Sequence, residues 1–505
     1  MCHAAARAFL IDDAYISFRY AANLADGQGL VFNAGERVEG YSNLLWVLLL
    51  AAGARLGLEP EWLSQALGLA AGFALVPLAA IAARRLLPAD AAALALLPAL
   101  WIASNRSLAA WSTGGLETRL FTLLLAAGLL LLADELDRGA HAFPRSCLPL
   151  GLALLCRADG FVPVAALLGA LVWIRRGRVG KHGGLLFALL GAVAGSHVLF
   201  RLVYYGALLP NTFHVKVTGV EWAAGLDYLL LAVRDYGLWL MLPLALVPLA
   251  PPRSSLARLA RATVLVQLAY LLAIGGDHFE FRFLDPLWVP LFVLAAAGLH
   301  DLARRVPARA TLRAAVAAGL VVTVWNAVPS WRGFESTAAT ISVEREAALC
   351  RSWREVGDWF RQHAAPGEVI SVRPAGVIPY RSRLRAFDEL GLNDPVVARR
   401  PPDPSPVAGH RKQATWEDIL VRGHVNYYIH HPDLRPSRPT PVPPRVIAGD
   451  GRAFALIPVS VELPSAWLQF EIVSEEAVLP DGVVDLRRVK SGIHLASNAA
   501  VLTGP

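Results

Sequence analysis

Two adjacent acids near the start of the chain, Asp12 and Asp13, are the first residues whose types and spacing could do chemistry. They precede a helical stretch, AYISFRYAANLADG, that ends at Gly27. One interpretation is local, because an N-cap acid and an acidic neighbour both favour the positive end of a helix dipole. The other is catalytic, because a carboxylate within about 3 Å of a hydroxyl can remove its proton in the transition state. The residues alone leave both open.

Four further polar groups interrupt apolar sequence downstream. Ionised groups at membrane depth cost about 2.5 to 3.5 kcal/mol on insertion scales, so they are typical of functional sites. Each group is ambiguous. An internal ion pair would explain RADG, and a solvated loop would explain NTFHVK. DHFE is a weak pattern for a divalent cation. The groups are Glu117 at the end of NRSLAAWSTGGLE, Arg157 and Asp159 in RADG, Asn211, His214 and Lys216 in YYGALLPNTFHVKVTG, and Asp277, His278, Glu280 and Arg282 in GGDHFEFRF.

The composition shows what kind of scaffold must position these groups. Of the 505 residues, 55% are hydrophobic and 17% are charged, and the mean hydropathy is +0.46. Soluble domains carry about 25% charged residues, so a single water-soluble globule is excluded. Several apolar runs approach or reach the roughly 20 residues that cross a bilayer. The sequence therefore predicts an all-α polytopic membrane domain with about ten spans.

The predicted spans are separated by connectors that differ in charge. Arginines gather in every second connector, as the positive-inside rule predicts for cytoplasmic loops. The polar groups described above then fall on the outer face, together with both ends of the chain. The predicted spans are 63–83, 88–104, 118–134, 146–157, 160–175, 183–204, 230–250, 260–275, 284–300 and 310–329.

The chain divides into three predicted regions. Residues 1–62 form an outer arm that contains the acid pair and an apolar segment, 42–58, that we expect to lie along the outer interface because a span there would break the charge alternation. Residues 63–331 form the membrane domain. Residues 332–505 contain no run long enough to span, and their short β-branched runs and one probable helix predict a soluble extracytoplasmic α/β domain.

Net charge and cysteines add little. The formal charge of +7 comes mainly from arginines in short loops, which indicates membrane topology and argues against a nucleic-acid partner. The cysteines show neither metal-ligand spacing nor a framework of pairs, so we predict no metal site from them and no disulfide.

Several runs resemble the polyprenyl-phosphate-dependent membrane glycosyltransferases of the GT-C type, in particular the terminal β-(1→2)-arabinofuranosyltransferase branch of mycobacterial cell-wall enzymes. The resemblance touches most of the length. It is carried by DDAYISFRYAANLADGQGLVFNAGERVEGYSNLLW, GLETRLFTLLLA, CRADGF, YYGALLPNTFHVKVTG, GGDHFEFRFLDPLWVPL and, in the last region, GVIPYRSRLRAFDELGLND followed by GHRK.

The resemblance implies a function and roles for the polar residues. It implies transfer of a sugar from a polyprenyl-phosphate donor to a cell-envelope glycan on the outer face of the cytoplasmic (inner) membrane, with inversion at the sugar. Asp12 or Asp13 would be the base, with Asp12 favoured because the first acid is the usual base in relatives. The implied donor phosphate or sugar contacts are Arg19, Arg157, Asp159, Asn211, His214, Lys216, Asp277 and Arg282, and the implied acceptor contacts are Asp388, Asp394 and His410.

Other expectations stay open at this stage. A turn with capping acids explains Asp388 and Asp394 equally well. No cofactor is assigned, and a divalent cation is left open. Such relatives begin with a transmembrane helix before the acidic motif, so we expect either a start codon placed too late or a shortened relative. A protein O-mannosyltransferase-like enzyme, a transporter and a non-catalytic membrane protein are the alternatives, although the paired repeats expected of a transporter are not evident.

Overall fold

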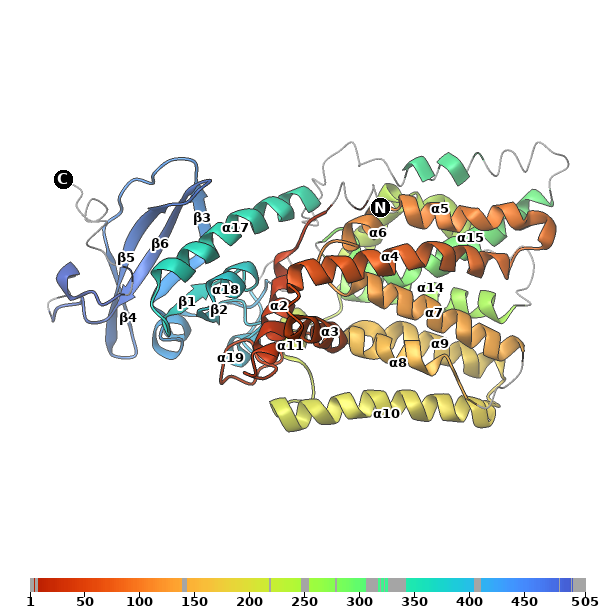
Figure 1. Ribbon diagram of the computed structural model, residues 1–505, viewed down its shortest axis with the longest axis horizontal. Helices are drawn as coiled ribbons and strands as arrows, with labels where there is room; N and C mark the ends of the chain where they lie inside the picture. Colours follow the sequence, from red (N-terminus) through yellow and green to blue (C-terminus); the bar gives the residue numbers. More distant parts are fainter. Residues whose placement is uncertain are drawn as a thin grey trace.

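The computed structural model is elongated, with a helical bundle at one end and a domain built on a β-sheet at the other (Figure 1). A short arm of helices from the N-terminal region lies between the two parts. The structure describes residues 4, 8–138, 143–217, 219–246, 254–277, 279–305, 317, 319–321, 323–325, 342–403, 410–480, 482–491 and 493.

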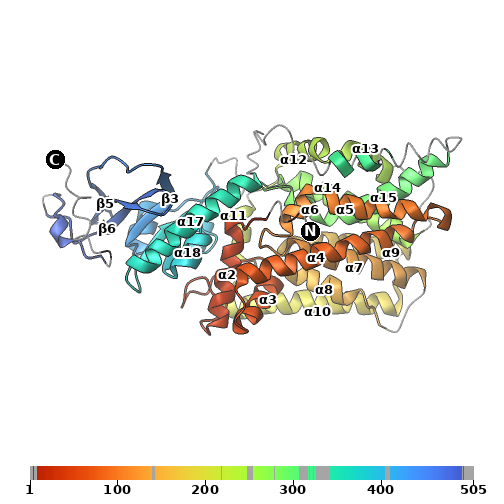
Figure 2. The same cartoon turned by 45° about the horizontal axis from the view of Figure 1, so that its top comes forward.

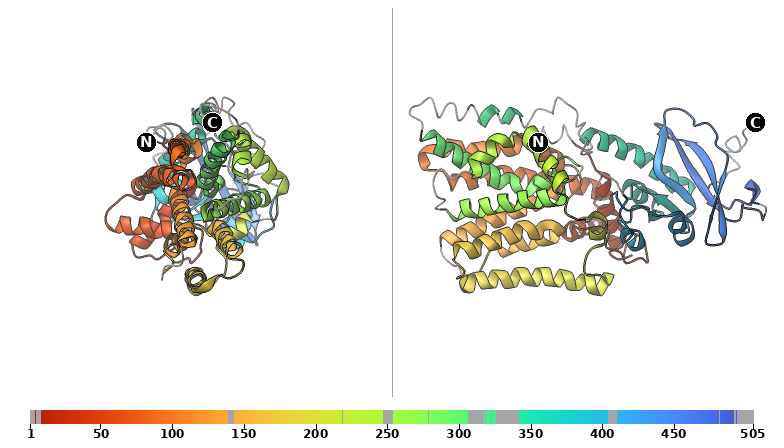
Figure 3. Two further views of the ribbon diagram at one scale, coloured as in Figure 1. Left: turned by 90° about the vertical axis from the view of Figure 1, so that its right-hand side faces the viewer. Right: turned by 180° about the vertical axis from the view of Figure 1, so that it is seen from behind.

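The bundle consists of helices that run roughly along the long axis of the molecule, as the end-on view shows (Figure 3). Leu, Ala, Val and Phe side chains fill the space between them, and the largest buried groups include Trp101 and Trp288. Its helices are α4 (Pro60–Arg84), α5 (Leu96–Ser104), α6 (Arg106–Trp111), α7 (Thr118–Asp137), α8 (Cys147–Cys156), α9 (Phe161–Ile174), α10 (Gly180–Tyr205), α12 (Trp222–Asp235), α13 (Leu238–Leu246), α14 (Ser255–Ile274) and α15 (Asp285–Ala303).

The predicted number of about ten spans is not confirmed. Within the described residues, four helices are long and apolar enough to cross a membrane: Pro60–Arg84, Gly180–Tyr205, Ser255–Ile274 and Arg282–Ala303. The predicted spans 146–157 and 160–175 correspond to the short helices α8 and α9. The predicted span 310–329 lies mostly outside the described residues.

The predicted single span 230–250 needs a correction. The segment contains two helices, α12 and α13, that are bent by 101° relative to each other (Figure 2). Gly237 lies at the break with φ 63°, a left-handed conformation that glycine adopts without steric cost and that ends a helix. The hydropathy of the segment does not reveal this break because both halves are apolar.

The arginine-rich connectors meet at one end of the bundle. Arg85 lies 3.8 Å from Asp134 near the end of α7, and Arg145 lies 3.3 Å from the same carboxylate. Arg175, at the end of α9, donates to the backbone carbonyl of Leu136 (3.4 Å). Helices α8 and α9 therefore run away from this end and back to it, and the RADG break between them lies at the opposite end.

The arm contains α2 (Asp12–Ala25) and α3 (Leu44–Arg55). At 1.5 Å per residue the 12 residues of α3 are too short to cross a bilayer, which agrees with the prediction for 42–58. The α3 residue Trp46 is fully buried and donates its ring N–H to the carbonyl of Gly115 (3.0 Å), so α3 is attached to the bundle.

The C-terminal region is an α/β domain, as predicted. Its six-stranded sheet has the order β2-β1-β3-β6-β5-β4; β1 pairs in parallel with β2 and with β3, whereas the remaining pairs are antiparallel. The strands are β1 (Val369–Val372), β2 (Arg385–Asp388), β3 (Tyr427–Arg435), β4 (Arg445–Gly449), β5 (Arg452–Glu462) and β6 (Trp467–Ser474), and the helices are α17 (Val343–His363), α18 (Val377–Ser382) and α19 (Pro395–Ala398).

The arm and the C-terminal domain share one hydrophobic core. Tyr15 and Phe18 of α2 pack edge-on against Tyr380 of α18, with ring centroids 5.5 and 6.0 Å apart. Both elements belong to the same cluster of buried residues, separate from the core of the bundle. The N-terminal arm is thus packed as part of the last domain to be synthesised.

Membrane topology follows from the arginine-rich end and gives a first prediction. We expect reporters fused after Arg178 or Arg305 to report the cytoplasm and a reporter fused after Lys490 to report the outside, because the basic loops stay inside. Paired alkaline phosphatase and green fluorescent protein fusions measure this. Fluorescence with no phosphatase activity from fusions after Lys490 would contradict the arrangement.

Candidate active site

The carboxylate of Asp12 joins the arm to the C-terminal domain. Its oxygens accept hydrogen bonds from the backbone amides of Gly376 (3.1 Å) and Val377 (2.8 Å) at the start of α18. The N-cap of α2 is Ile11, and no side chain caps that helix, so the N-cap interpretation of the acid pair is wrong. Burial raises the pKa of Asp12 to about 7, and this outweighs the two amides, which lower it.

Asp13 points to a different partner. Its Oδ2 lies 3.8 Å from Nζ of Lys216, and the two side chains are 28% and 42% exposed. Lys216 ends the short helix α11 (Asn211–Lys216). A carboxylate and an ammonium group therefore lie together at a partly open position.

Asn211 holds α11 in place. Its side-chain amide donates to the carbonyls of Gly391 (2.7 Å) and Leu392 (2.9 Å), and its backbone N–H donates to the carbonyl of Glu39 (3.0 Å). This indicates a positioning role for Asn211, where the sequence predicted a donor contact. His214, on the same helix, lies near the charges of Arg399 and Lys412, which lower its pKa together with burial, the largest cause.

Arg157 and Asp159 form a buried group with Glu117 at the same end of the bundle. Nε and Nη2 of Arg157 donate to the two oxygens of Asp159 (2.8 and 2.7 Å), and Nη1 lies 3.4 Å from Oε1 of Glu117. The guanidinium also lies over the rings of Phe121 and Phe283, 5.4 and 5.3 Å from their centroids. The predicted internal pair is present, and it is held in a fixed orientation.

Asp277 and Arg282 form the next group. Nε of Arg282 lies 3.7 Å from Oδ2 of Asp277, and the hydroxyl of Tyr228 donates to Oδ1 (3.1 Å). Burial raises the pKa of Asp277 to about 6, whereas the positive charges of Arg282, Arg157 and Lys216 lower it. These electrostatic couplings place the predicted cations in one neighbourhood around Asp277.

The other predicted residue of this loop has a different partner. Glu280 is 4% exposed and accepts from Nε of Arg106 (2.6 Å) and from the hydroxyl of Tyr236 (2.6 Å). These contacts use one oxygen of Glu280 inside the bundle, so a cation role for it is not supported. His278 lies outside the described residues. No group of three His, Cys, Asp or Glu side chains among the described residues is placed to hold a metal ion.

Arg19 requires a correction. It is 7% exposed, and its guanidinium donates to the carbonyl of Phe32, to the side chain of Asn33 and to the carbonyls of Pro379 and Leu384. Burial lowers its pKa to about 9. With these donors occupied by the arm and by α18, Arg19 joins the two elements and is not placed to bind a phosphate.

Two of the three predicted acceptor residues are structural. Asp388 is 2% exposed and accepts from the amides of Leu390, Gly391 and Asn393 in one turn. Asp394 caps α19 through the amides of Val396 and Val397 (3.0 and 2.9 Å). The interpretation of both acids as turn and cap residues is therefore the better one. His410 is exposed, and the charges of Asp13 and Lys216 act on it, so it belongs to the site's neighbourhood.

Two buried ion pairs were not predicted. Arg201 of α10 donates from Nε to both oxygens of Glu39 (3.0 and 2.8 Å). Arg119 of α7 pairs with Asp285 at the start of α15, and the hydroxyl of Thr122 donates to the same carboxylate (3.0 Å). A search for charged residues within apolar runs would have found both arginines, because such residues are costly unless they are paired.

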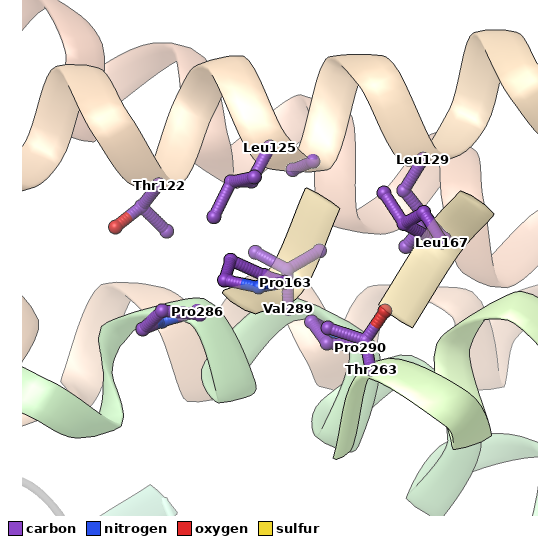
Figure 4. A pocket seen from close by; sticks show the side chains of 10 residues that line it. Thr122, Leu125, Leu129, Pro163, Leu167, Thr263, Pro286, Val289 and Pro290 are labelled. Atoms are coloured by element: carbon purple, nitrogen blue, oxygen red, sulfur yellow. The ribbon is translucent and has the colours of Figure 1, made fainter. Parts of the chain in front are cut away.

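A narrow apolar pocket lies between α7, α9, α14 and α15, with room for about one water-sized sphere (Figure 4). Three prolines, Pro163, Pro286 and Pro290, form part of its wall. It begins at Thr122 and follows α7 to Leu129, away from the end that holds Glu117.

Comparisons with solved structures define the class of the fold. ArnT from Cupriavidus metallidurans in the apo state aligns with a TM-score of 0.53 at 13% identity, over 75% of this chain and 82% of that chain. ArnT bound to undecaprenyl phosphate aligns with a TM-score of 0.56 at 13% identity, over 92% of this chain and 94% of that chain. The fold is therefore similar to that of GT-C type membrane enzymes.

Sequence comparisons identify a more particular likeness. The terminal β-(1→2)-arabinofuranosyltransferase of Mycobacterium tuberculosis is 29% identical over 343 residues, which cover 57% of this chain and 52% of the relative. The enzyme of the same name from Corynebacterium glutamicum is 27% identical over 332 residues, 57% of this chain and 47% of the relative. This chain spans about half the length of these curated relatives. A domain of unknown function, DUF8728, matches residues 339–477.

The contact of Asp12 with α18 predicts a pH-dependent stability. Burial raises the pKa of Asp12 from its ordinary value of 3.8 to about 7 in the folded protein, so the folded state binds this proton more tightly than the unfolded state. The protonated Asp12 contributes up to about 4 kcal/mol to the free energy of unfolding. This contribution is fully present below pH 4 and is lost as the pH rises to about 7. The unfolding temperature of wild type should therefore decrease between pH 4 and pH 7. In Asp12→Asn this decrease should be smaller.

Thermal unfolding of the detergent-solubilised protein at several pH values measures this effect. Asp26→Asn, at the exposed C-terminal end of the same helix, is the control and should keep the wild-type slope. Equal slopes for wild type and Asp12→Asn would contradict a buried, protonated Asp12.

Proposed function

We propose that this chain is an integral-membrane glycosyltransferase that moves a sugar from a polyprenyl-phosphate donor to a cell-envelope glycan. The observation that carries the proposal is the placement of Asp13, 3.8 Å from Lys216, beside the group formed by Arg157, Asp277 and Arg282. A partly exposed carboxylate thus lies beside Lys216, and Lys216, Arg157 and Arg282 all act electrostatically on Asp277. The likeness to terminal arabinofuranosyltransferases supports arabinofuranose as the sugar.

Asp13 is the better candidate for the base, whereas the sequence slightly favoured Asp12. Both oxygens of Asp12 accept backbone amides of α18, which gives Asp12 a docking role. Asp13 is 28% exposed and points to the cations. In the proposed reaction, Asp13 accepts the proton of the acceptor hydroxyl while the hydroxyl oxygen attacks the anomeric carbon of the donor.

The cations stabilise the leaving group in this scheme. As the bond between the anomeric carbon and the phosphate oxygen breaks, negative charge grows on the polyprenyl phosphate, and fixed positive groups lower the energy of that state. Lys216 is the most exposed of these cations, while Arg157 and Arg282 hold their positions through Asp159, Asp277 and the surrounding rings. Attack from the face opposite the phosphate inverts the anomeric centre.

The lipid part of the donor requires an apolar path beside these cations. Apolar residues of α7 from Leu125 to Leu129 line the narrow pocket in Figure 4, and we infer that the prenyl chain extends from the phosphate along this apolar side of the bundle into the bilayer. By the positive-inside rule we expect the arginine-rich end in the cytoplasm, which supports a site on the outer face of the inner membrane. A lipid-linked donor suits that face, because nucleotide sugars are absent there.

Substitution of the acid pair tests the proposal. Asp13→Asn keeps the size of the side chain and removes its basicity, so transfer from a polyprenyl-phosphate arabinose to an arabinan oligosaccharide should fall about 10²-fold or more. Asp12→Asn should retain more activity, because it weakens the contact between the arm and α18 but leaves the proposed base in place. Activity is measured with purified protein in proteoliposomes.

The matched control is Asp26→Asn on the same helix, 58% exposed, which should transfer at the wild-type rate. Normal transfer by Asp13→Asn, with a 10²-fold loss in Asp12→Asn, would move the base to Asp12. Normal transfer by both variants would sink carboxylate catalysis from α2.

A further inference from the structure

The carboxyl ends of β1 and β2 lie beside the middle of β3 in the C-terminal sheet. Val372 ends β1 and lies opposite Asp388 of β2 on one side and His430 of β3 on the other. The next residues along the chain, Arg373 and Glu389, therefore lie side by side with His430. In open α/β sheets, ligands bind in the crevice beyond these ends, where neighbouring strands are reached by connections in opposite directions.

The side chains at this edge form a connected polar group. Glu389 has a side chain that is only 4% exposed, and it accepts from the hydroxyl of Ser371 (2.7 Å) and contacts Nδ1 of His430 (2.6 Å). Nε of Arg373 lies 3.8 Å from Oε2 of Glu389. Nη2 of Arg373 donates to the side-chain oxygen of Gln413 (3.0 Å). Arg373 and His430 are about one-third exposed, so the group is open to solvent.

The backbone at this edge is strained at His430. His430 has φ 57°, in the left-handed region that residues other than glycine rarely adopt. The register between β1 and β3 shifts at Ser371 and Val372, next to His430. Strain of this kind costs about 1 to 3 kcal/mol and is concentrated at functional sites. The ring of His430 contacts Glu389 through Nδ1 (2.6 Å).

The polar edge faces the proposed transfer site. Gly376, three residues after Arg373, donates its amide to Asp12, the neighbour of the proposed base. The charges of Asp13, Lys216 and Arg373 all act on His410, so both Arg373 and Asp13 lie in the neighbourhood of His410. A ligand bound at the edge would extend toward Asp13.

We propose that Arg373, Glu389 and His430 bind the hydroxyl groups of the acceptor saccharide and present its terminal hydroxyl to Asp13. This inference rests on the proposed function. The guanidinium of Arg373 and the imidazole of His430 can donate hydrogen bonds, and the carboxylate of Glu389 can accept them, as vicinal hydroxyls require. A phosphate group suits this edge poorly, because the carboxylate of Glu389 would repel it.

Direct binding to the full-length protein in detergent micelles tests the inference apart from catalysis. The probes are an arabinofuranosyl hexasaccharide and an α-mannosyl hexasaccharide, titrated by calorimetry, with undecaprenyl phosphate titrated separately. We expect wild type to bind one of the two hexasaccharides. The affinity for that hexasaccharide should fall about tenfold or more in Arg373→Gln and in Glu389→Gln, since each variant loses a hydrogen bond to a charged group. Affinity for undecaprenyl phosphate should change less than twofold.

The control is Arg445→Gln, which breaks an exposed pair with Glu471 elsewhere on the same sheet and should change neither affinity. Arg373 is partly exposed, so its variant carries the test if the buried Glu389 variant does not fold. Binding of neither hexasaccharide by wild type, unchanged saccharide affinity in Arg373→Gln, or an equal loss of undecaprenyl phosphate affinity would each overturn the inference. Saccharide binding without any transfer activity would contradict the proposed function alone.

Discussion

The contact between Asp12 and the first turn of α18 is the interaction on which the rest of the site depends. The contact joins Asp12 to Gly376 and Val377, which are 364 and 365 positions away in the chain. It sets where the C-terminal domain meets the arm. The approach is close enough that a side chain at Gly376 could not fit, since a Cβ built there would lie 1.9 Å from the carbonyl oxygen of Asp12. Glycine at this position is therefore required by packing against α2.

Three segments that are distant in sequence converge on the space next to this contact. The arm supplies Asp13, the helix α11 supplies Lys216, and the loop after α14 supplies Asp277. Each is fixed by contacts outside the site: Arg19 ties α2 to α18, and Asn211 ties α11 to the turn at Gly391. Structural hydrogen bonds between the two parts of the molecule thus position groups that do not contact one another strongly.

The sequence predicted the largely helical part, the end that gathers arginines and the α/β domain, because these follow from composition and local periodicity, and the interfacial position of 42–58 stays a prediction. It did not predict the bend at Gly237, because the polar run RDYG was included in a single apolar span. It also assigned ligand contacts to Arg19, Asn211 and Asp388, which make structural hydrogen bonds. A polar residue in a motif reveals its type, whereas its partner is fixed by tertiary contacts that a single sequence does not contain.

The central claim is that Asp13 and Lys216 act together on one reaction. A double-mutant cycle on transfer tests it most directly, with Asp13→Asn, Lys216→Gln and the double variant compared at saturating acceptor. If the carboxylate and the ammonium group serve the same step, the double variant should transfer about as slowly as the slower single variant. Fully additive losses, with the double variant slower by the product of the two single effects, would show that the two groups act independently and would contradict the account.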